Sequence, residues 1–293
     1  MKKFLTSILL VALTAISSNA QLLWKISGNG LEKPSYLFGT HHVAPISVLD
    51  SVPGFNEALS SAEKVYGELI MSEAQSPAAQ QLMMSAAMAP QDSTLTAVLT
   101  AAQTDSLNTM LQKYMGPMVS AAQFAPMKPA IVSTVVAMVQ AQSAFPDFNQ
   151  QEQLDSEIQK RGAAAGKEIG GLETMEIQCQ ALFGSPILEQ ANDLMDPVRN
   201  DGKSVEMAHR LANAYLAGDL SEMLSIIEDP TFGSSEGTER LINKRNANWV
   251  RVMAGLLPTA SVLIAVGAGH LPGDKGLISL LRKEGYTVTP VEK

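Results

Sequence analysis

Two apolar runs end in the same Gly-x-x-His pattern: Tyr36-Leu37-Phe38-Gly39-Thr40-His41-His42 and Val262-Leu263-Ile264-Ala265-Val266-Gly267-Ala268-Gly269-His270. Each reads as a strand, a glycine turn, an imidazole and then a proline, Pro45 in the first and Pro272 in the second. The chain has four histidines, and three of them lie in these two turns. Because functional side chains of open α/β sheets gather where strands end, the pattern predicts a site there.

The segments around the two turns follow a similar plan of strand, connection and strand. We expect a hairpin before the first turn, then a short helix and a strand that pairs in parallel with the hairpin's second strand, as in a βαβ unit. The second turn should lead into a helix and a final strand. The expected strands are residues 22–26, 35–38, 64–70, 262–266 and 286–291, and the expected helices are residues 47–61 and 274–284.

Between these ends lies a long stretch rich in Ala, Met, Gln and Leu, which favour helices. A short strand at residues 167–173 interrupts it. The sequence therefore predicts an α/β fold with a small, mainly parallel or mixed sheet built from the N- and C-terminal segments. A large helical insertion, about residues 74–165 and 174–258, forms a second lobe or lid within one domain, residues 21–293.

The first twenty residues have the pattern of a secretory signal peptide. Lys2 and Lys3 precede an apolar run at residues 4–16, and Ser18-Asn19-Ala20 offers small residues for cleavage. The run is shorter than the roughly 20 apolar residues that span a bilayer. We expect an exported protein without a stable membrane anchor after cleavage, periplasmic in a Gram-negative source and secreted otherwise.

Charge and cysteine content limit the partners that the protein can have. The formal net charge is −8, and loss of the two lysines in the signal peptide makes it more negative. This disfavours nucleic acid and anionic membranes as partners and suits cationic ligands such as metal ions. The single cysteine, Cys179, excludes an internal disulfide and is interpreted as a small buried residue. A peptide or small molecule is the expected substrate.

The chain is also rich in methionine. We expect most methionines to fill the core, because this side chain adapts to irregular interiors. The alternative is a pliable groove for apolar peptide side chains. The positions concerned are Met83, Met84, Met88, Met110, Met115 and Met118.

Three of the strand ends carry side chains that can bind a metal. His42 and His270 follow two strands, and Glu68 ends the apolar strand at residues 64–70. A carboxylate in so apolar a strand is costly unless it is paired or metal-bound. Two imidazoles and one carboxylate form an open ligand set in which a bound water becomes a nucleophile. Capped turn histidines are the alternative interpretation, and His41 should face away from His42.

Three further residues are candidates for catalysis. Glu173 ends the middle strand and is interpreted as a ligand, a general base, a partner that fixes a histidine tautomer, or simply an acid at a helix N-terminus. Arg245 and Asn246 lie on a helix at about residues 238–257, where they can orient a carbonyl or stabilise an oxyanion. An exposed basic helix face is the alternative. Arg245 and Trp249 are i,i+4 neighbours that can stack.

These motifs together resemble the TraB/GumN family, which is related to the Tiki metalloproteases. The resemblance rests on the segments around His42, Glu68, Glu173, Trp249 and His270. It implies metal-linked histidines at His42 and His270, an acid at Glu68, and a protease that uses a divalent ion such as Mn or Co. His41 departs from the pattern, because relatives commonly carry an aliphatic residue there.

The sequence thus predicts an exported divalent-metal hydrolase, using Mn, Co or Zn, that acts on peptide or amide bonds. Two alternatives stay open. One is a metal-independent, esterase-like hydrolase in which His42 or His270 is the general base, as in the erythromycin-esterase relatives of this family. The other is a non-catalytic protein that binds peptide or haem in the same place.

Overall fold

A six-stranded mixed sheet forms the centre of the computed structural model, which describes residues 21–229 and 233–291. The predicted signal peptide at residues 1–20 lies outside this part of the chain. The strands lie in the order β4-β3-β5-β2-β1-β6, and the first four of these are mutually parallel. They are β1 (Leu23–Gly28), β2 (Ser35–Thr40), β3 (Lys64–Gly67), β4 (Glu168–Gly171), β5 (Val262–Gly267) and β6 (Tyr286–Pro290).

The strand β5 runs through the middle of the sheet, between β2 and β3. Its residues 262–266 are all buried, as an uninterrupted apolar run requires when both faces of a strand are covered. Tyr36 of β2 and Val65 of β3 both stand opposite Leu263. The predicted direct pairing of β2 with β3 is therefore wrong. The two strands are parallel, but the most apolar strand of the chain separates them and takes the position with the greatest burial.

Alternate residues of a strand point to opposite faces of the sheet, so the apolar strands present two apolar faces. Helices cover both of them. Phe38, Val65 and Leu263 belong to one core, and Leu37, Ile264 and Trp249 belong to the other. The first core also includes residues of α1 (Val48–Ser51), α2 (Phe55–Ser61), α8 (Leu154–Ala164), α11 (Asp201–Ala217) and α12 (Leu220–Ile227). The second is built on α14 (Lys244–Leu256) and α15 (Leu277–Lys283).

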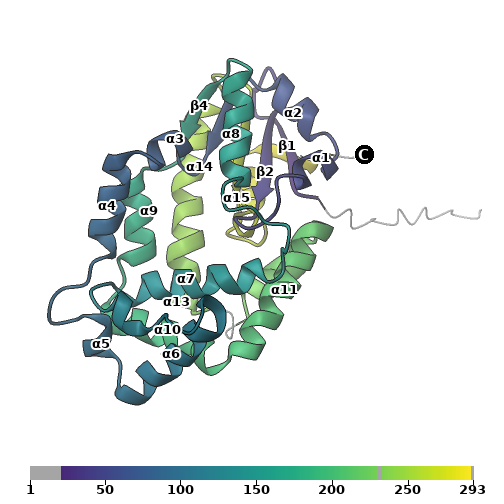
Figure 1. Cartoon of the computed structure of the whole chain (residues 1–293). Coiled ribbons are helices and arrows are strands. Elements are labelled where there is room, and N and C mark those ends of the chain that lie inside the picture. Colours follow the sequence, from purple (N-terminus) through teal and green to yellow (C-terminus); the bar gives the residue numbers. More distant parts are fainter. Residues whose placement is uncertain (1–20, 230–232, 292–293) are drawn as a thin grey trace, which may run out of the picture.

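The helical insertion forms a second lobe with a core of its own. Figure 1 shows α5, α6, α7 and α10 below the sheet, with α14 running between the two parts. This arrangement confirms the predicted fold class. The remaining helices are α3 (Met71–Ala74), α4 (Pro77–Ala87), α5 (Leu95–Val98), α6 (Ala101–Met115), η1 (Ala121–Phe124), α7 (Pro129–Gln142), α9 (Met175–Phe183), α10 (Ile187–Arg199), α13 (Ser235–Thr238), η2 (Glu239–Asn243) and η3 (Ala268–His270).

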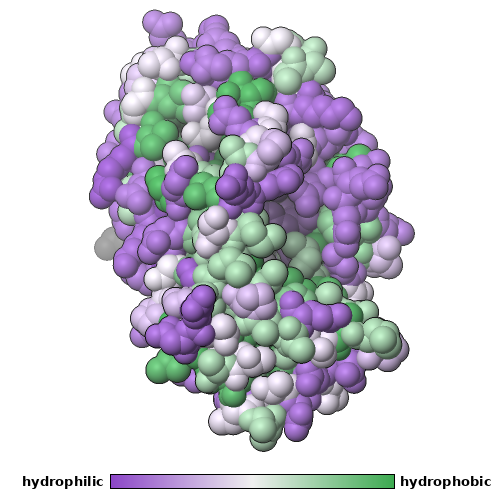
Figure 2. Space-filling view, turned by 60° about the vertical axis from the view of Figure 1, so that its left-hand side comes forward, coloured by the Kyte–Doolittle hydropathy of each residue, from purple (hydrophilic) through white to green (hydrophobic). Residues whose placement is uncertain are grey.

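Exposed methionines mark the surface of this second lobe. The prediction that most methionines fill the core is only partly correct. Five of those that the structure describes are buried, namely Met110, Met195, Met207, Met223 and Met253, whereas Met83, Met84, Met88, Met115 and Met118 are exposed. The helix α4 carries three of the exposed ones, if its C-cap residue is included, and contains no charged residue. Figure 2 shows hydrophobic residues gathered over the lower half of one face, below a hollow in the middle of the molecule. The spacing of the methionines along a helix shows which of them share a face. It does not show whether another helix packs on that face.

His41 packs inside the first core, away from the site. Its ring centroid lies 4.9 Å from that of Phe145 and 5.2 Å from that of Tyr215. Burial lowers the pKa of His41 to about 4. The unfolded chain therefore binds a proton at His41 between about pH 6.5 and 4 while the folded chain does not, so stability falls as the pH is lowered through this range.

We expect His41→Phe to weaken this acid sensitivity, because phenylalanine suits the same aromatic surroundings and does not titrate. The difference in unfolding free energy between pH 7 and pH 5 should shrink by about 2 kcal/mol relative to wild type. Urea unfolding at the two pH values measures it, with the exposed His209→Phe as the matched control. An unchanged pH difference in His41→Phe would show that His41 does not carry the effect.

Candidate functional site

The carboxyl ends of β2, β3 and β5 lie side by side and bring the predicted residues to one edge of the sheet. Glu68 directly follows β3, and His270 ends the short helix η3 that follows β5. His270 Nε2 lies 3.8 Å from Glu68 Oε1, and the Gly267 backbone N–H donates to the same oxygen at 2.9 Å. Two residues that are far apart in the sequence thus meet because parallel neighbouring strands end at the same edge.

Arg245 connects the two buried glutamates of the site. Its Nη2 donates to Glu68 Oε2 at 2.5 Å and to Glu173 Oε1 at 2.7 Å, and its Nε donates to Glu173 Oε2 at 3.1 Å. Its Nη1 donates to the Leu241 carbonyl at 3.0 Å and lies 3.2 Å from His270 Nε2. A guanidinium has five N–H groups, and acceptors of the protein occupy all of them. The side chain is therefore held in one orientation.

Glu173 is the main anchor of this arginine. Its side chain is only 2% exposed. Besides the hydrogen bonds from Arg245, it accepts one from the indole N–H of Trp249 at 3.0 Å and one from the side-chain amide N–H of Gln178 at 3.4 Å. The predicted stacking is confirmed, since the Arg245 guanidinium lies 4.5 Å from the Trp249 ring centroid. Each oxygen of Glu173 is thus occupied by donors of the protein.

Asn246 determines which nitrogen of His270 carries the proton. The Asn246 amide nitrogen donates to the carbonyls of His270 and Lys275, at 3.1 and 2.9 Å. Its oxygen, which can only accept, lies 2.6 Å from His270 Nδ1. The proton of His270 therefore resides on Nδ1 and leaves a lone pair on Nε2. Burial lowers the pKa of His270 to about 4, so the ring is neutral at pH 7.

Glu68 is the one carboxylate of this network that reaches the surface, with 11% of its side chain exposed. Burial alone would raise its pKa, but the charges of His270, Arg245 and His42 and the N–H of Gly267 outweigh burial and lower it to about 2. The carboxylate is therefore ionised at neutral pH. A neutral imidazole and an anionic oxygen face each other at this strand edge.

His42 stands at the same edge but is open to solvent, with 68% of its side chain exposed. Its Nδ1 lies 3.6 Å from Asp155 Oδ2, and the Thr40 hydroxyl donates to Asp155 Oδ1 at 2.9 Å. Asp155 raises the pKa of His42, although exposure to water limits the strength of such a pair. Sequence reasoning missed Asp155, because it lies on α8 in the helical insertion and no spacing connects it to His42.

A family model matches residues 22–290 of this chain. The chain belongs to the TraB/PrgY/gumN family. The predicted resemblance is thereby confirmed. No solved structure matches the chain.

Two curated proteins of Danio rerio are similar to this TraB/PrgY/gumN family member. "Metalloprotease TIKI1" is 26% identical over 315 aligned residues, which cover 91% of this chain and 62% of the relative. "Metalloprotease TIKI2" is 28% identical over 163 residues, which cover 46% of this chain and 32% of the relative. The chain therefore spans less than two thirds of the length of either relative. Within residues 21–229 and 233–291, no helix has the length and apolar character needed to cross a membrane.

The names of these relatives imply a divalent metal, and such an ion needs several donor side chains around one point. In the part of the chain that the structure describes, no three His, Cys, Asp or Glu side chains are grouped closely enough to hold one. The pair of His270 and Glu68 fits in its spacing, although His270 Nε2 here accepts from Arg245 Nη1 at 3.2 Å. Donor atoms about 2.0–2.2 Å from one ion lie up to roughly 4 Å apart, and these two are separated by 3.8 Å. The predicted third ligand, His42, stays a prediction.

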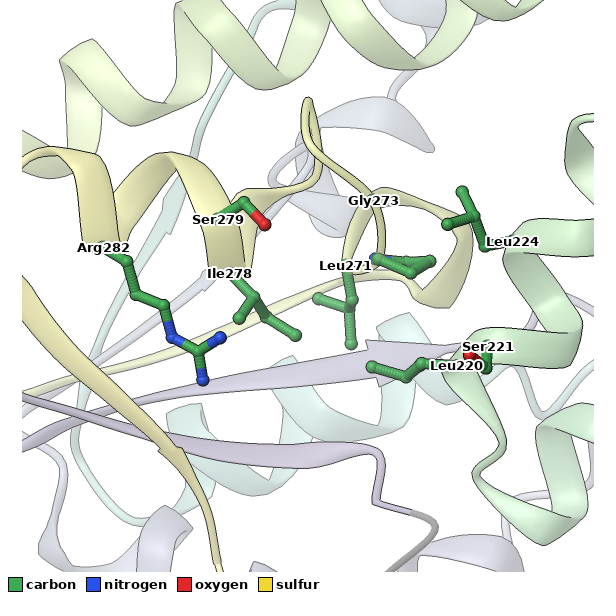
Figure 3. Close-up of a pocket in the computed structure, with 9 residues that line it drawn as sticks. Leu220, Ser221, Leu224, Leu271, Gly273, Ile278, Ser279 and Arg282 are labelled. Carbon is green, nitrogen blue, oxygen red and sulfur yellow. The ribbon is translucent and has the colours of Figure 1, made fainter. Parts of the chain in front are cut away.

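A small pocket lies near this site but is separate from it. It has a volume of about 210 Å³ and is lined by Leu224 of α12, Leu271, and Ile278 and Arg282 of α15, among others (Figure 3). Glu68 and His270 do not line it. The candidate site at the strand edge is therefore distinct from this mainly apolar pocket.

Proposed function

We propose that this protein is an exported hydrolase that depends on a divalent metal ion and cleaves peptide or amide bonds. The observation that carries the proposal is the contact between His270 and Glu68. A neutral imidazole with its lone pair on Nε2 faces an ionised carboxylate at 3.8 Å, at the edge of a sheet where several strands end. The metalloprotease names of the two relatives support the same chemistry.

In this proposal His270, Glu68 and His42 would hold the ion. A bound ion would polarise the substrate carbonyl and lower the pKa of a water molecule. Asn246 keeps the proton of His270 on Nδ1, so that Nε2 carries the lone pair. In this structure that lone pair accepts from Arg245 Nη1 at 3.2 Å, and it would have to exchange this contact for the ion. The Gly267 N–H and Arg245 orient the Glu68 carboxylate, which would accept a proton from a water molecule at the site.

The remaining residues of the network are assigned positioning roles. The sequence predicted that Arg245 and Asn246 contact the substrate and that Glu173 transfers a proton. The donors of Arg245 and the acceptors of Glu173 are occupied within the protein, and Asn246 is completely buried. We therefore assign to them the orientation of Glu68 and His270 in place of direct contact with the substrate.

One observation favours a second candidate, a hydrolase that needs no metal. His42 pairs with Asp155, and its ring is exposed to solvent. A carboxylate that orients an accessible imidazole is the arrangement of a general base in many hydrolases. In this alternative His42 activates the nucleophile, and Glu68 and His270 are structural.

Chelation distinguishes the two candidates. The chain without residues 1–20 is stripped of metal, and hydrolysis of a defined peptide mixture is followed by mass spectrometry before and after addition of Mn²⁺, Co²⁺ or Zn²⁺. We expect hydrolysis to stop on chelation and to return with at least one ion. Turnover that persists after exhaustive chelation would favour the general base His42. Failure to cleave any peptide with any ion would contradict the proposed peptidase.

The surface next to the site supports an apolar peptide as substrate. The chain runs from Glu68 through α3 into the charge-free α4, and from Glu173 into α9. The helices α4 and α9 pack against each other, and Gln178 of α9 lies 3.5 Å from Glu68 Oε2. The methionine-bearing surface is thus built from the two segments that follow the glutamates, and peptide side chains beside the cleaved bond would contact it.

We expect Met84→Glu to raise the KM for an apolar peptide about tenfold and to leave kcat unchanged. Met84 is 55% exposed, so the charge should not disturb folding, and a lost apolar contact of about 1.4 kcal/mol corresponds to tenfold. Steady-state kinetics measures both constants. Leu216→Glu, at an equally exposed position on α11, is the matched control. Equal KM values in Met84→Glu and wild type would exclude this surface from substrate binding.

A further inference from the structure

Asp155 is held in one orientation beside His42. It is the second residue of α8, and its side chain is 14% exposed. The hydroxyl of Thr40, a buried residue at the end of β2, donates to Asp155 Oδ1 at 2.9 Å. The other oxygen, Oδ2, lies 3.6 Å from His42 Nδ1. Because Thr40 precedes His42 by two residues, the same strand end fixes both the histidine and its acidic partner.

We propose that Asp155 is a positioning residue whose Oδ2, 3.6 Å from His42 Nδ1, holds the proton of the neutral ring on that nitrogen, so that the lone pair lies on Nε2. The inference rests on the proposed function, since only a hydrolase that uses His42 needs this orientation. It holds for both candidates, because a metal ligand and a general base each require an imidazole nitrogen without a proton.

The arrangement repeats the one around His270. There the oxygen of Asn246 faces Nδ1 at 2.6 Å and leaves Nε2 as the nitrogen without a proton, which accepts from Arg245 Nη1. Two side-chain oxygens, one on α8 and one on α14, thus present the two histidines through the same ring atom. They differ in charge, because Asp155 is an anion and Asn246 is neutral. An anionic partner makes the lone pair of an imidazole a stronger base and metal ligand, so His42 is the more basic of the two histidines.

The substitution Asp155→Asn tests the orientation directly. Thr40 continues to donate to the Oδ1 position, so the amide N–H₂ of the new side chain faces His42 Nδ1. A ring nitrogen that faces a donor must carry the lone pair, and the proton moves to Nε2. The variant keeps the shape of the side chain and inverts the tautomer of His42.

Long-range ¹⁵N–¹H correlation spectra read the tautomer of each histidine at a pH at which the rings are neutral. The chain has four histidines, and single substitutions assign their signals. We expect the Nδ1–H form of His42 in wild type and the Nε2–H form in Asp155→Asn, with His270 in the Nδ1–H form in both. The same His42 tautomer in both proteins would overturn the proposal, as would an Nε2–H form in wild type.

A second measurement relates the tautomer to the site. The chain without residues 1–20 is stripped of metal and titrated with Mn²⁺ in a calorimeter. Asp155→Asn should bind Mn²⁺ 10- to 100-fold more weakly than wild type, roughly the effect of losing such a partner. Asp50→Asn, an exposed acid on α1, should bind as wild type does. An inverted tautomer with unchanged Mn²⁺ affinity and unchanged hydrolysis would overturn the role in the site. Absence of both binding and hydrolysis in wild type would contradict the proposed function, and the spectra would still decide the orientation of His42.

Discussion

Replacement of Arg245 by methionine should lower the free energy of unfolding by about 3–5 kcal/mol. Arg245 lies between Glu68 and Glu173, whose side chains are almost inaccessible to water. Removing one partner of a buried pair leaves the other charge without compensation, and this loss exceeds the strength of the pair itself. Methionine restores much of the packing against Trp249 but donates none of the hydrogen bonds. Urea unfolding at pH 7 measures the loss.

The exposed pair of Arg210 and Glu222 provides the matched control. Arg210 Nη2 lies 2.6 Å from Glu222 Oε1, a distance like those at Arg245, but the two side chains are 42% and 38% exposed. Arg210→Met should cost less than about 1 kcal/mol. Arg245→Lys should fall between the two, because lysine keeps the charge and cannot make five bonds. Similar small losses in Arg245→Met and Arg210→Met would show that the network does not stabilise the fold.

The substitution Glu68→Gln should reduce kcat/KM for peptide hydrolysis by about 10²- to 10⁴-fold and leave the fold intact. Glutamine has the shape of glutamate, but it carries no charge for a metal and cannot accept the proton of a water molecule. It keeps only one acceptor for the donors Gly267 and Arg245. We expect a modest loss of stability beside the large loss of activity, and circular dichroism separates the two.

Glu63→Gln is the control for this experiment. Glu63 directly precedes β3, at the opposite end of the strand from Glu68, and is exposed. The variant should hydrolyse peptides at the wild-type rate. If Glu68→Gln also kept wild-type kcat/KM, the carboxylate would have a structural role only, and His42 with Asp155 would become the better candidate for the chemistry.

The parts of the site that depend on local chain geometry could be predicted from the sequence. An apolar run followed by glycine and histidine identifies a strand end, and parallel strands end at a common edge. These two facts were sufficient to predict that Glu68 and His270 meet, and the structure confirms their contact. The stacking of Arg245 on Trp249 was predictable for the same reason, because i,i+4 neighbours share a helix face.

The parts that depend on long-range packing could not be predicted. Nothing near β2 or β3 shows that β5 separates them, because burial of distant strands decides their order. The sequence gives no sign that Glu173 and Glu68 occupy the donors of Arg245, which converts a supposed substrate contact into a support. Asp155 was missed because its partner lies on another element. The exposed methionines of α4 look like core positions until the absence of a covering helix is seen.

The metal-binding stoichiometry of wild type beside His270→Ala tests the central claim most directly. Both proteins are stripped of metal, equilibrated with Mn²⁺, Co²⁺ or Zn²⁺, desalted and measured by mass spectrometry for ions per chain, with His209→Ala as the control for loss of an exposed imidazole. We predict one ion per chain of at least one of these metals in wild type and in His209→Ala, and far less of it in His270→Ala. Equal metal content in all three proteins would contradict the account.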